Sequence, residues 1–166
     1  MSAVPEAEII RFDSVAQFAA CKRDSGGRIV LTNGCFDLLH PGHLAVLSGA
    51  AQMGDTLIVG VNNDQGVRSL KGAGRPVMAL EDRLAMVCAL RWVDAVTAFE
   101  GDTADRLIEQ VQPTFYVKGG DYDPRSGDRV LPEVETLDRL GIEIAYVPLL
   151  AGHASSDLID RSPQTP

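Results

Sequence analysis

The feature that most constrains the fold is an alternation of short, β-branched apolar runs with helical stretches, which begins at Arg28. This alternation is typical of βαβ units that build a parallel sheet, and it predicts an α/β protein. We predict five strands, at residues 29–32, 56–61, 95–98, 115–118 and 143–147. The spacing of apolar residues predicts helices at 15–21, 44–52, 80–91, 104–111 and 133–140. Asp102 or Thr103 is a candidate helix cap, and Gly141 a candidate helix stop.

The length of 166 residues fits one domain. We divide the chain into an N-terminal extension with a helix packed on the domain (1–27), the domain itself (28–161) and a loose tail (162–166). No apolar run approaches the roughly 20 residues that span a bilayer. The N-terminus also lacks a basic region followed by an apolar one. We therefore expect a cytoplasmic protein that does not act at a membrane.

The net charge of −8 argues against a nucleic-acid partner, because such binding depends on Lys and Arg that replace condensed counterions. A small anionic ligand stays open, since a few local cations and backbone N–H groups bind phosphate even in an acidic protein. The three cysteines, Cys21, Cys35 and Cys88, lie far apart without metal-ligand spacing. This favours buried free thiols over disulfides or a zinc site.

Two segments, residues 71–76 and 119–128, are rich in glycine, proline and charge. A solvated linker is the simpler interpretation of each. Both follow elements that emerge from the predicted sheet, and ligands of open α/β folds bind outside the carboxyl ends of the strands. Their position favours a functional role.

The segment Thr32–His43 runs from a predicted strand through a glycine-containing turn into the start of a helix. Gly34 permits a tight backbone, and Gly42 permits close approach of a ligand. The helix N-terminus offers free N–H groups and a positive dipole end to phosphate. His40 and His43, three residues apart, would project toward one ligand. Both can donate hydrogen bonds to phosphate oxygens as charge develops in a transition state.

As an isolated string, His-x-Gly-His is equally typical of capping or core histidines. Zinc binding is disfavoured, because no nearby Cys or His completes a familiar ligand set. The P-loop pattern G-x-x-x-x-G-K-[ST] is absent. The strand, turn and helix around the tetrad make the phosphate interpretation the stronger one.

With this motif the chain resembles the cytidylyltransferase-like superfamily of nucleotidyltransferases, whose hallmark is H-x-G-H at the start of the first helix. The segments 32–37, 60–64, 71–72, 75–76 and 117–122 are similar to those of bacterial D-glycero-β-D-manno-heptose 1-phosphate adenylyltransferases. The resemblance covers about residues 28–161. It implies a Rossmann-like, three-layer α/β/α fold of the HxGH nucleotidyltransferase type with a parallel five-stranded sheet.

The resemblance implies transfer of AMP from ATP to D-glycero-D-manno-heptose 1-phosphate, with ADP-heptose and pyrophosphate as products and Mg²⁺ as the cofactor. Attack of the sugar phosphate on the α-phosphate would be in line, without a covalent enzyme intermediate. Members of the family are often fused to a sugar kinase, for which 166 residues leave no room. We therefore expect a chain that acts alone or beside a separate kinase, and the resemblance implies a homodimer.

The resemblance also assigns site residues. The catalytic positions would be His40, His43 and Lys71. The nucleotide-binding positions would be Asn33, Gly34, Cys35, Phe36, Gly42, His43, Arg83, Lys118, Gly120, Asp121, Ser155 and Ser156. The substrate-binding positions would be Asp37, Asn62, Arg75, Asp121 and Tyr122. No metal site made by protein ligands alone is implied, with Asp37 or Asp121 as candidate contacts of a metal ion.

Several of these residues have a plainer interpretation. Lys71 is also typical of a solvated surface lysine, and Arg83, which follows Glu81 at a helix start, of a surface pair with a neighbouring carboxylate. Residues 118–121 are also typical of a plain turn, and the late serines of helix caps. The family pattern near those serines is closer to Ser-Thr-Thr, from which this chain departs at Ala154.

Two other functions stay open. The first is a cytidylyltransferase for glycerol 3-phosphate or another small phosphorylated alcohol, against which the resemblance of residues 118–122 argues. The second is a noncatalytic nucleotide-binding module, against which the intact His40, His43 and Lys71 argue.

Overall fold

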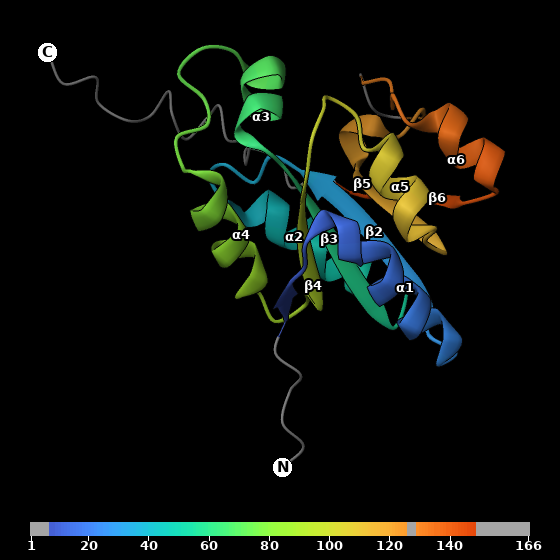
Figure 1. Ribbon diagram of the computed structural model, residues 1–166. Helices are drawn as coiled ribbons and strands as arrows, with labels where there is room; N and C mark the ends of the chain where they lie inside the picture. Colours follow the sequence, from blue (N-terminus) through green and yellow to red (C-terminus); the bar gives the residue numbers. More distant parts are fainter. Residues whose placement is uncertain (1–6, 126–128, 149–166) are drawn as a thin grey trace, which may run out of the picture.

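The β-branched runs form a six-stranded parallel sheet with the strand order β1-β4-β3-β2-β5-β6. Figure 1 shows the computed structural model, which describes residues 7–125 and 129–148. The strands are β1 (Glu8–Ile9), β2 (Ile29–Gly34), β3 (Thr56–Asn62), β4 (Ala95–Phe99), β5 (Phe115–Gly119) and β6 (Glu143–Val147). All five predicted strands are present. The addition is β1, two edge residues that pair with β4 and are too short for a periodic pattern.

Helices cover both faces of the sheet, because successive side chains of a strand point to opposite sides. Ile29 and Leu31 enter one core with residues of α1 (Val15–Asp24), α5 (Asp105–Val111) and α6 (Val134–Leu140). Val30, between them, enters a second core with residues of α2 (Pro41–Ala51) and α4 (Leu80–Cys88). The predicted three-layer α/β/α architecture is confirmed (Figure 1).

Helix boundaries differ from the prediction in ways that local chemistry explains. Helix α2 begins at Pro41 rather than at residue 44, because proline at the first helical position loses no hydrogen bond. Helix α3 (Asp64–Lys71) was not predicted, since Gly66 lowers its helix propensity. The Asn63 side chain starts this helix by accepting the Gly66 N–H at 2.8 Å. Helix α4 ends at Cys88, not at residue 91. Two short 3₁₀ helices, η1 (Phe12–Ser14) and η2 (Gly120–Tyr122), complete the elements.

The predicted cap of α5 is wrong. The N-cap residue is Ala104 rather than Asp102 or Thr103, and it has no side chain that can accept a hydrogen bond. The N–H of Ala104 donates instead to the Glu133 carboxylate at 2.9 Å, from the segment before α6. The predicted helix stop at Gly141 is confirmed: this residue caps α6 in the left-handed conformation, with φ 66°.

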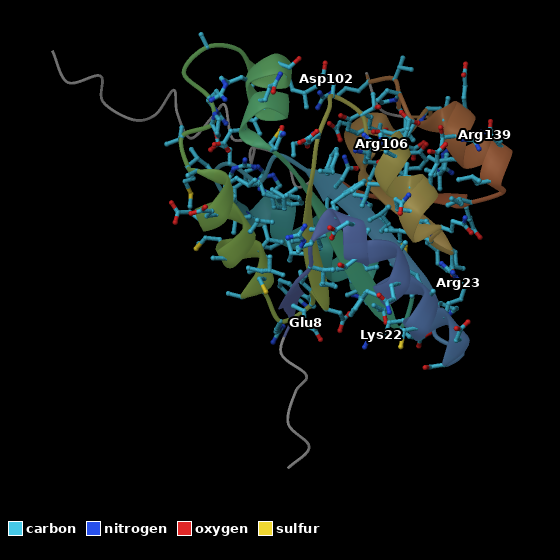
Figure 2. All side chains as sticks on the ribbon, in the orientation of Figure 1. Glu8, Lys22, Arg23, Asp102, Arg106 and Arg139 are labelled. Atoms are coloured by element: carbon cyan, nitrogen blue, oxygen red, sulfur yellow. The ribbon has the colours of Figure 1, made fainter. Side chains whose placement is uncertain are left out.

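Arginine side chains connect α1, α5 and α6, the helices that share one core. Figure 2 labels Arg23 on α1 and Arg139 on α6. Arg23 donates to the Val111 carbonyl at the end of α5 at 2.6 Å, and Arg139 donates to Glu109 of α5 at 2.6 Å.

In the described part of the chain, no helix is both long and apolar enough to cross a membrane.

The three cysteines form no disulfide within the part of the chain that the structure describes, but, against the prediction, they are not all buried. Cys35 and Cys88 are partly buried, whereas Cys21 is exposed. Cys21 lies beyond Val15 and Ala19, the buried residues of α1, in the part of the helix that is exposed.

Candidate active site

The site lies where β2, β3 and β5 end at the same edge of the parallel sheet. Figure 1 shows α3 at this end of the sheet, above the turn that joins β2 to α2. The last residues of these strands are Gly34, Asn62 and Gly119. Parallel strands therefore bring together motifs that are distant in sequence, as the fold class predicts.

The turn after β2 is tightly built. Phe36 adopts a positive φ of 48°, which is uncommon for a residue with a side chain. Its ring is 4% exposed and packs against Gly34, where an added Cβ would lie 3.2 Å from the ring. The ring also lies 5.1 Å from that of His43, centroid to centroid. A side chain at residue 34 would therefore crowd the Phe36 ring, which favours glycine at this position.

His40 and His43 form a stacked pair at the start of α2. His40 is the N-cap residue, and Pro41 occupies the first turn. The two ring centroids lie 3.8 Å apart with an interplanar angle of 30°. The histidines of the sequence motif therefore present one joint surface at a helix N-terminus, where anions are stabilised.

His43 is neutral at physiological pH. Burial, aided by the nearby positive charges of His40 and Lys71, lowers its pKa from 6.5 to about 4. Its buried Nδ1 has no hydrogen-bond partner among residues 7–125 and 129–148. A neutral imidazole carries one N–H, so His43 can offer a ligand a single hydrogen bond but no positive charge.

The lowered pKa of His43 makes stability depend on pH. Unfolded His43 binds a proton below about pH 6.5, whereas the folded ring resists protonation down to about 4. Stability is then fully present above 6.5 and falls as pH falls toward 4, by about 3 kcal/mol from this group. Urea unfolding at several pH values should show a shallower pH dependence in His43→Ala than in the natural protein. Parallel pH dependences would contradict the buried, neutral state.

Asp37 organises the loop that follows α3. Its side chain is 1% exposed, and one carboxylate oxygen accepts from Arg75 Nε at 2.6 Å. The other oxygen accepts the backbone N–H groups of Val77 and Met78 at 2.8 and 3.0 Å. Both oxygens are occupied by the chain's own donors, so the carboxylate fixes the loop onto the turn. Contact of Asp37 and Arg75 with a substrate stays a prediction.

Arg83 is a buried residue that contacts the loop between α3 and α4. Its side chain is fully buried, so the surface pairing that we considered for it is wrong. The guanidinium donates to the carbonyl of Cys35, just after β2, at 2.6 Å and to that of Asn62, the last residue of β3, at 2.8 Å. It also donates to the Met78 carbonyl at 3.1 Å and pairs with Asp64 of α3 at 2.8 Å. Arg83 therefore joins the strand ends to the loop, and its contact with a nucleotide stays a prediction.

Lys71 is exposed at the end of α3, before Gly72, which has a φ of 91°. Its charge is close enough to the turn to act on the pKa of His43 and on that of Cys35. Burial of the Cys35 thiol is the larger effect and raises its pKa. The charge of Lys71 therefore lies near His43 and Cys35, and its catalytic role stays a prediction.

The end of β5 brings a second lysine to the site. Lys118 is 8% exposed, and its Nζ donates to Asn33 Oδ1 at 2.9 Å. The Tyr116 hydroxyl donates to the same oxygen. Lys118 Nζ also lies 5.0 Å from the ring centroid of Tyr122. Residues 118–119 end β5 and residues 120–122 form η2, and the ligand-binding role of residues 118–121 stays a prediction.

The segment after β5 is held by Arg129, which sequence reasoning missed. Its guanidinium donates to Asp121 Oδ2 at 3.2 Å and lies 4.8 Å from the Tyr122 ring centroid. Its backbone N–H donates to the Asp121 carbonyl at 3.0 Å. Asp121 therefore holds Arg129 against the start of this segment. Gly120, the residue before it, begins η2.

The remaining described residues that the sequence singled out lie at the end of β3 and in the first turns of α2 and α4. The Asn62 amide donates to the Gly101 carbonyl at 3.3 Å, toward the loop after β4. Gly42 lies in the first turn of α2, and Glu81 is exposed in the first turn of α4. Ser155 and Ser156 lie outside the described residues. A cavity of about 360 Å³ lies between α3 and the loop after β4, and Asp102, which Figure 2 labels, is one of the residues that line it. None of the residues predicted for the site lines this cavity.

Three comparisons with known proteins agree with this geometry. The family model described as cytidylyltransferase-like matches residues 31–147. The bifunctional protein HldE of Geotalea uraniireducens (strain Rf4) is 41% identical over 156 residues, which are 94% of this chain and 31% of that protein. HldE of Halorhodospira halophila (strain DSM 244 / SL1) is 48% identical over 139 residues, 84% of this chain and 28% of that protein. The chain thus spans less than a third of the length of these relatives.

A solved structure is also similar. The lipopolysaccharide core biosynthesis protein from Thermoplasma volcanium GSS1 superposes with a TM-score of 0.60 at 26% identity, covering 75% of this chain and 98% of that one. The fold and the histidine pair define an enzyme of the nucleotidyltransferase class. This chain belongs to the cytidylyltransferase-like family.

Proposed function

We propose that this chain transfers AMP from ATP to D-glycero-D-manno-heptose 1-phosphate and releases pyrophosphate. The observation that carries the proposal is the stacked pair of His40 and His43 at the N-terminus of α2, at the end of β2. Lys71 and Lys118 approach the same strand ends, although the protein as a whole carries a net charge of −8. Local donors and cations of this kind suit a triphosphate.

In the proposed reaction, an oxygen of the sugar phosphate attacks the α-phosphorus of ATP. The bond from this phosphorus to the oxygen that bridges the α- and β-phosphates breaks in line, and pyrophosphate leaves with that oxygen. The nucleophile is already ionised at neutral pH, so no side chain needs to act as a base. His43, as a neutral donor, and the N–H groups of α2 stabilise the charge that develops on the phosphates.

Magnesium suits the triphosphate better than it suits the protein. Within the described ranges, no group of three or more His, Cys, Asp or Glu side chains could hold a metal ion. Asp37 has both oxygens occupied by protein donors, and Asp121 is paired with Arg129. We therefore propose that Mg²⁺ arrives on the phosphates of ATP, where it would neutralise charge on the leaving pyrophosphate.

The choice of sugar is supported by the relatives rather than by the site. Those that match most of this chain are named HldE, and the similar solved structure is named for lipopolysaccharide core biosynthesis. A homodimer and a separate sugar kinase in the same pathway stay predictions, as does cytoplasmic localisation. The description of the family model favours CTP as the alternative donor, with a small phosphorylated alcohol as acceptor.

Donor and acceptor are tested together. The protein is incubated with Mg²⁺, with ATP or CTP, and with a panel containing heptose 1-phosphates of both anomers, hexose 1-phosphates and glycerol 3-phosphate. Mass spectrometry of the products should detect ADP-heptose, with ATP preferred over CTP. A product formed from CTP and glycerol 3-phosphate alone would replace the proposal with the alternative. Tight ATP binding without any product would identify a noncatalytic module.

A further inference from the structure

The Asn33 side chain, on the last residue but one of β2, receives two hydrogen bonds from the neighbouring strand β5 (Figure 1). Its amide oxygen accepts from Lys118 Nζ at 2.9 Å and from the Tyr116 hydroxyl. The strand register explains why these side chains meet. Tyr116 is the register partner of Leu31. Two residues further along each strand, Lys118 and Asn33 therefore lie side by side on the same face of the sheet.

The chemistry of these donors determines which way the Asn33 amide points. An ammonium has protons and no acceptor, so only the amide oxygen can face Lys118. The NH₂ group of the amide must then point away from the lysine. Asn33 is partly buried, and within residues 7–125 and 129–148 no acceptor is hydrogen-bonded to its Nδ2. The amide therefore has two N–H donors to offer to a ligand.

Tyr116 is the more rigid of the two groups that hold the amide. Its side chain is fully buried, and its ring packs in the core that β2 shares with α5 and α6. Burial raises the pKa of Tyr116 well above its ordinary value, so the hydroxyl keeps its proton and stays a donor. Lys118 reaches the same oxygen through a flexible four-carbon stem, whereas a packed ring fixes its hydroxyl in place.

Toward a ligand, Asn33 and Lys118 present hydrogen-bond donors and no acceptor. The Asn33 oxygen is used by two donors of the chain itself, which leaves its NH₂ group. The Lys118 ammonium has three protons, of which Asn33 accepts one. A surface of this kind suits a ligand that is rich in acceptor oxygens, as a phosphate is.

We propose that Tyr116 is a positioning residue that holds the Asn33 amide with its NH₂ group turned toward the phosphates of the nucleotide. That a phosphate lies there rests on the proposed function. That Tyr116 fixes the amide is a property of the free protein. The two statements can therefore fail separately.

The amide can be followed directly by NMR, because the chain has only three asparagines, Asn33, Asn62 and Asn63. Protein labelled with ¹⁵N-asparagine gives three side-chain NH₂ signals, and their heteronuclear NOE reports how strongly each amide is immobilised on the nanosecond timescale. In Tyr116→Phe, the NOE of Asn33 should fall, while those of Asn62 and Asn63 should stay unchanged. An unchanged NOE of Asn33 in folded Tyr116→Phe would overturn the proposal.

The Tyr116→Phe variant should fold, because phenylalanine keeps the ring in the core and Lys118 still donates to the Asn33 oxygen. The matched control is Tyr146→Phe, which removes a hydroxyl from β6, the strand on the other side of β5. Its Asn33 NOE should equal that of the natural protein. Equal losses in both variants would contradict the proposal, because they would reflect a loosened sheet rather than one hydrogen bond.

A second readout applies to the nucleotide. In Tyr116→Phe, the affinity for ATP with Mg²⁺, measured by calorimetry, should fall about fivefold, and kcat/KM should fall with it. In an Asn33→Ala background, the same change should cause no further loss, because a residue that acts through Asn33 has nothing left to position. A second fivefold loss in that background would show a general structural role and overturn the proposal. If the natural protein neither binds ATP nor transfers a nucleotide, the proposed function fails, and the NOE of Asn33 still decides the role of Tyr116.

Discussion

Replacing His43 with alanine is expected to lower the turnover of adenylyl transfer by about 10²–10³-fold while the fold persists. The ring contacts that of His40, and a neutral, partly buried imidazole has one N–H that it can donate to a ligand. A donor aimed at charge that develops in the transition state acts mainly on kcat, so KM for ATP should change less. Steady-state kinetics and circular dichroism of the purified variant measure both quantities.

Two variants sharpen this result. His43→Asn keeps an N–H donor near the same place and should recover part of the lost rate. Cys21→Ala is the control. It changes an exposed residue of α1 outside the site and should keep the full rate. If His43→Ala is as active as the natural protein, the histidine is a packing residue against Phe36, and the catalytic assignment of the motif is wrong.

Replacing Asp37 with alanine should destabilise the protein by about 3–5 kcal/mol, because it leaves a largely buried guanidinium and two backbone N–H groups without their acceptor. The free energy of unfolding in urea measures this loss. Asp37→Asn keeps an oxygen for Val77 and Met78 and should lose less. Asp55→Ala removes an exposed partner of Arg28 and should change stability little.

The same experiment separates two roles of Asp37. A variant that is destabilised confirms that the carboxylate holds the loop of Arg75 to the turn. A variant that is as stable as the natural protein but cannot use the sugar phosphate would show that Asp37 serves the substrate alone. That outcome would contradict the structural role and support the prediction made from sequence.

The sheet and the histidine turn were predictable because their signals are local. The β-branched runs around Leu31 and Val59 are short and apolar, as buried strands are, and their alternation with helical stretches predicts a parallel sheet. The position of the site at one edge followed from parallel topology alone. The missed α3 illustrates the limit, since Gly66 weakens the pattern and the Asn63 cap is convincing only once the helix is known.

The partners of charged side chains could not be predicted, because they are tertiary contacts. The sequence around Arg83 is typical of a surface residue at a helix start. In the structure, Arg83 donates to the carbonyls of Cys35 and Asn62, which are 48 and 21 residues away along the chain. Asp37 reads as a ligand, yet its acceptor capacity is used within the chain. Glu133 follows a proline in a loop and has no motif at all, and only its burial distinguishes it from the exposed Glu135.

The central claim is that the strand ends and the His pair act on the α-phosphate of ATP. A single reaction followed by ³¹P NMR tests it, with ATP, Mg²⁺ and the sugar 1-phosphate that the product panel identifies. Pyrophosphate should appear in step with a new pair of coupled signals from the diphosphate of the nucleotide sugar, and His43→Ala should suppress both. Appearance of ADP with a doubly phosphorylated sugar would instead show transfer of the γ-phosphate, and it would contradict the account.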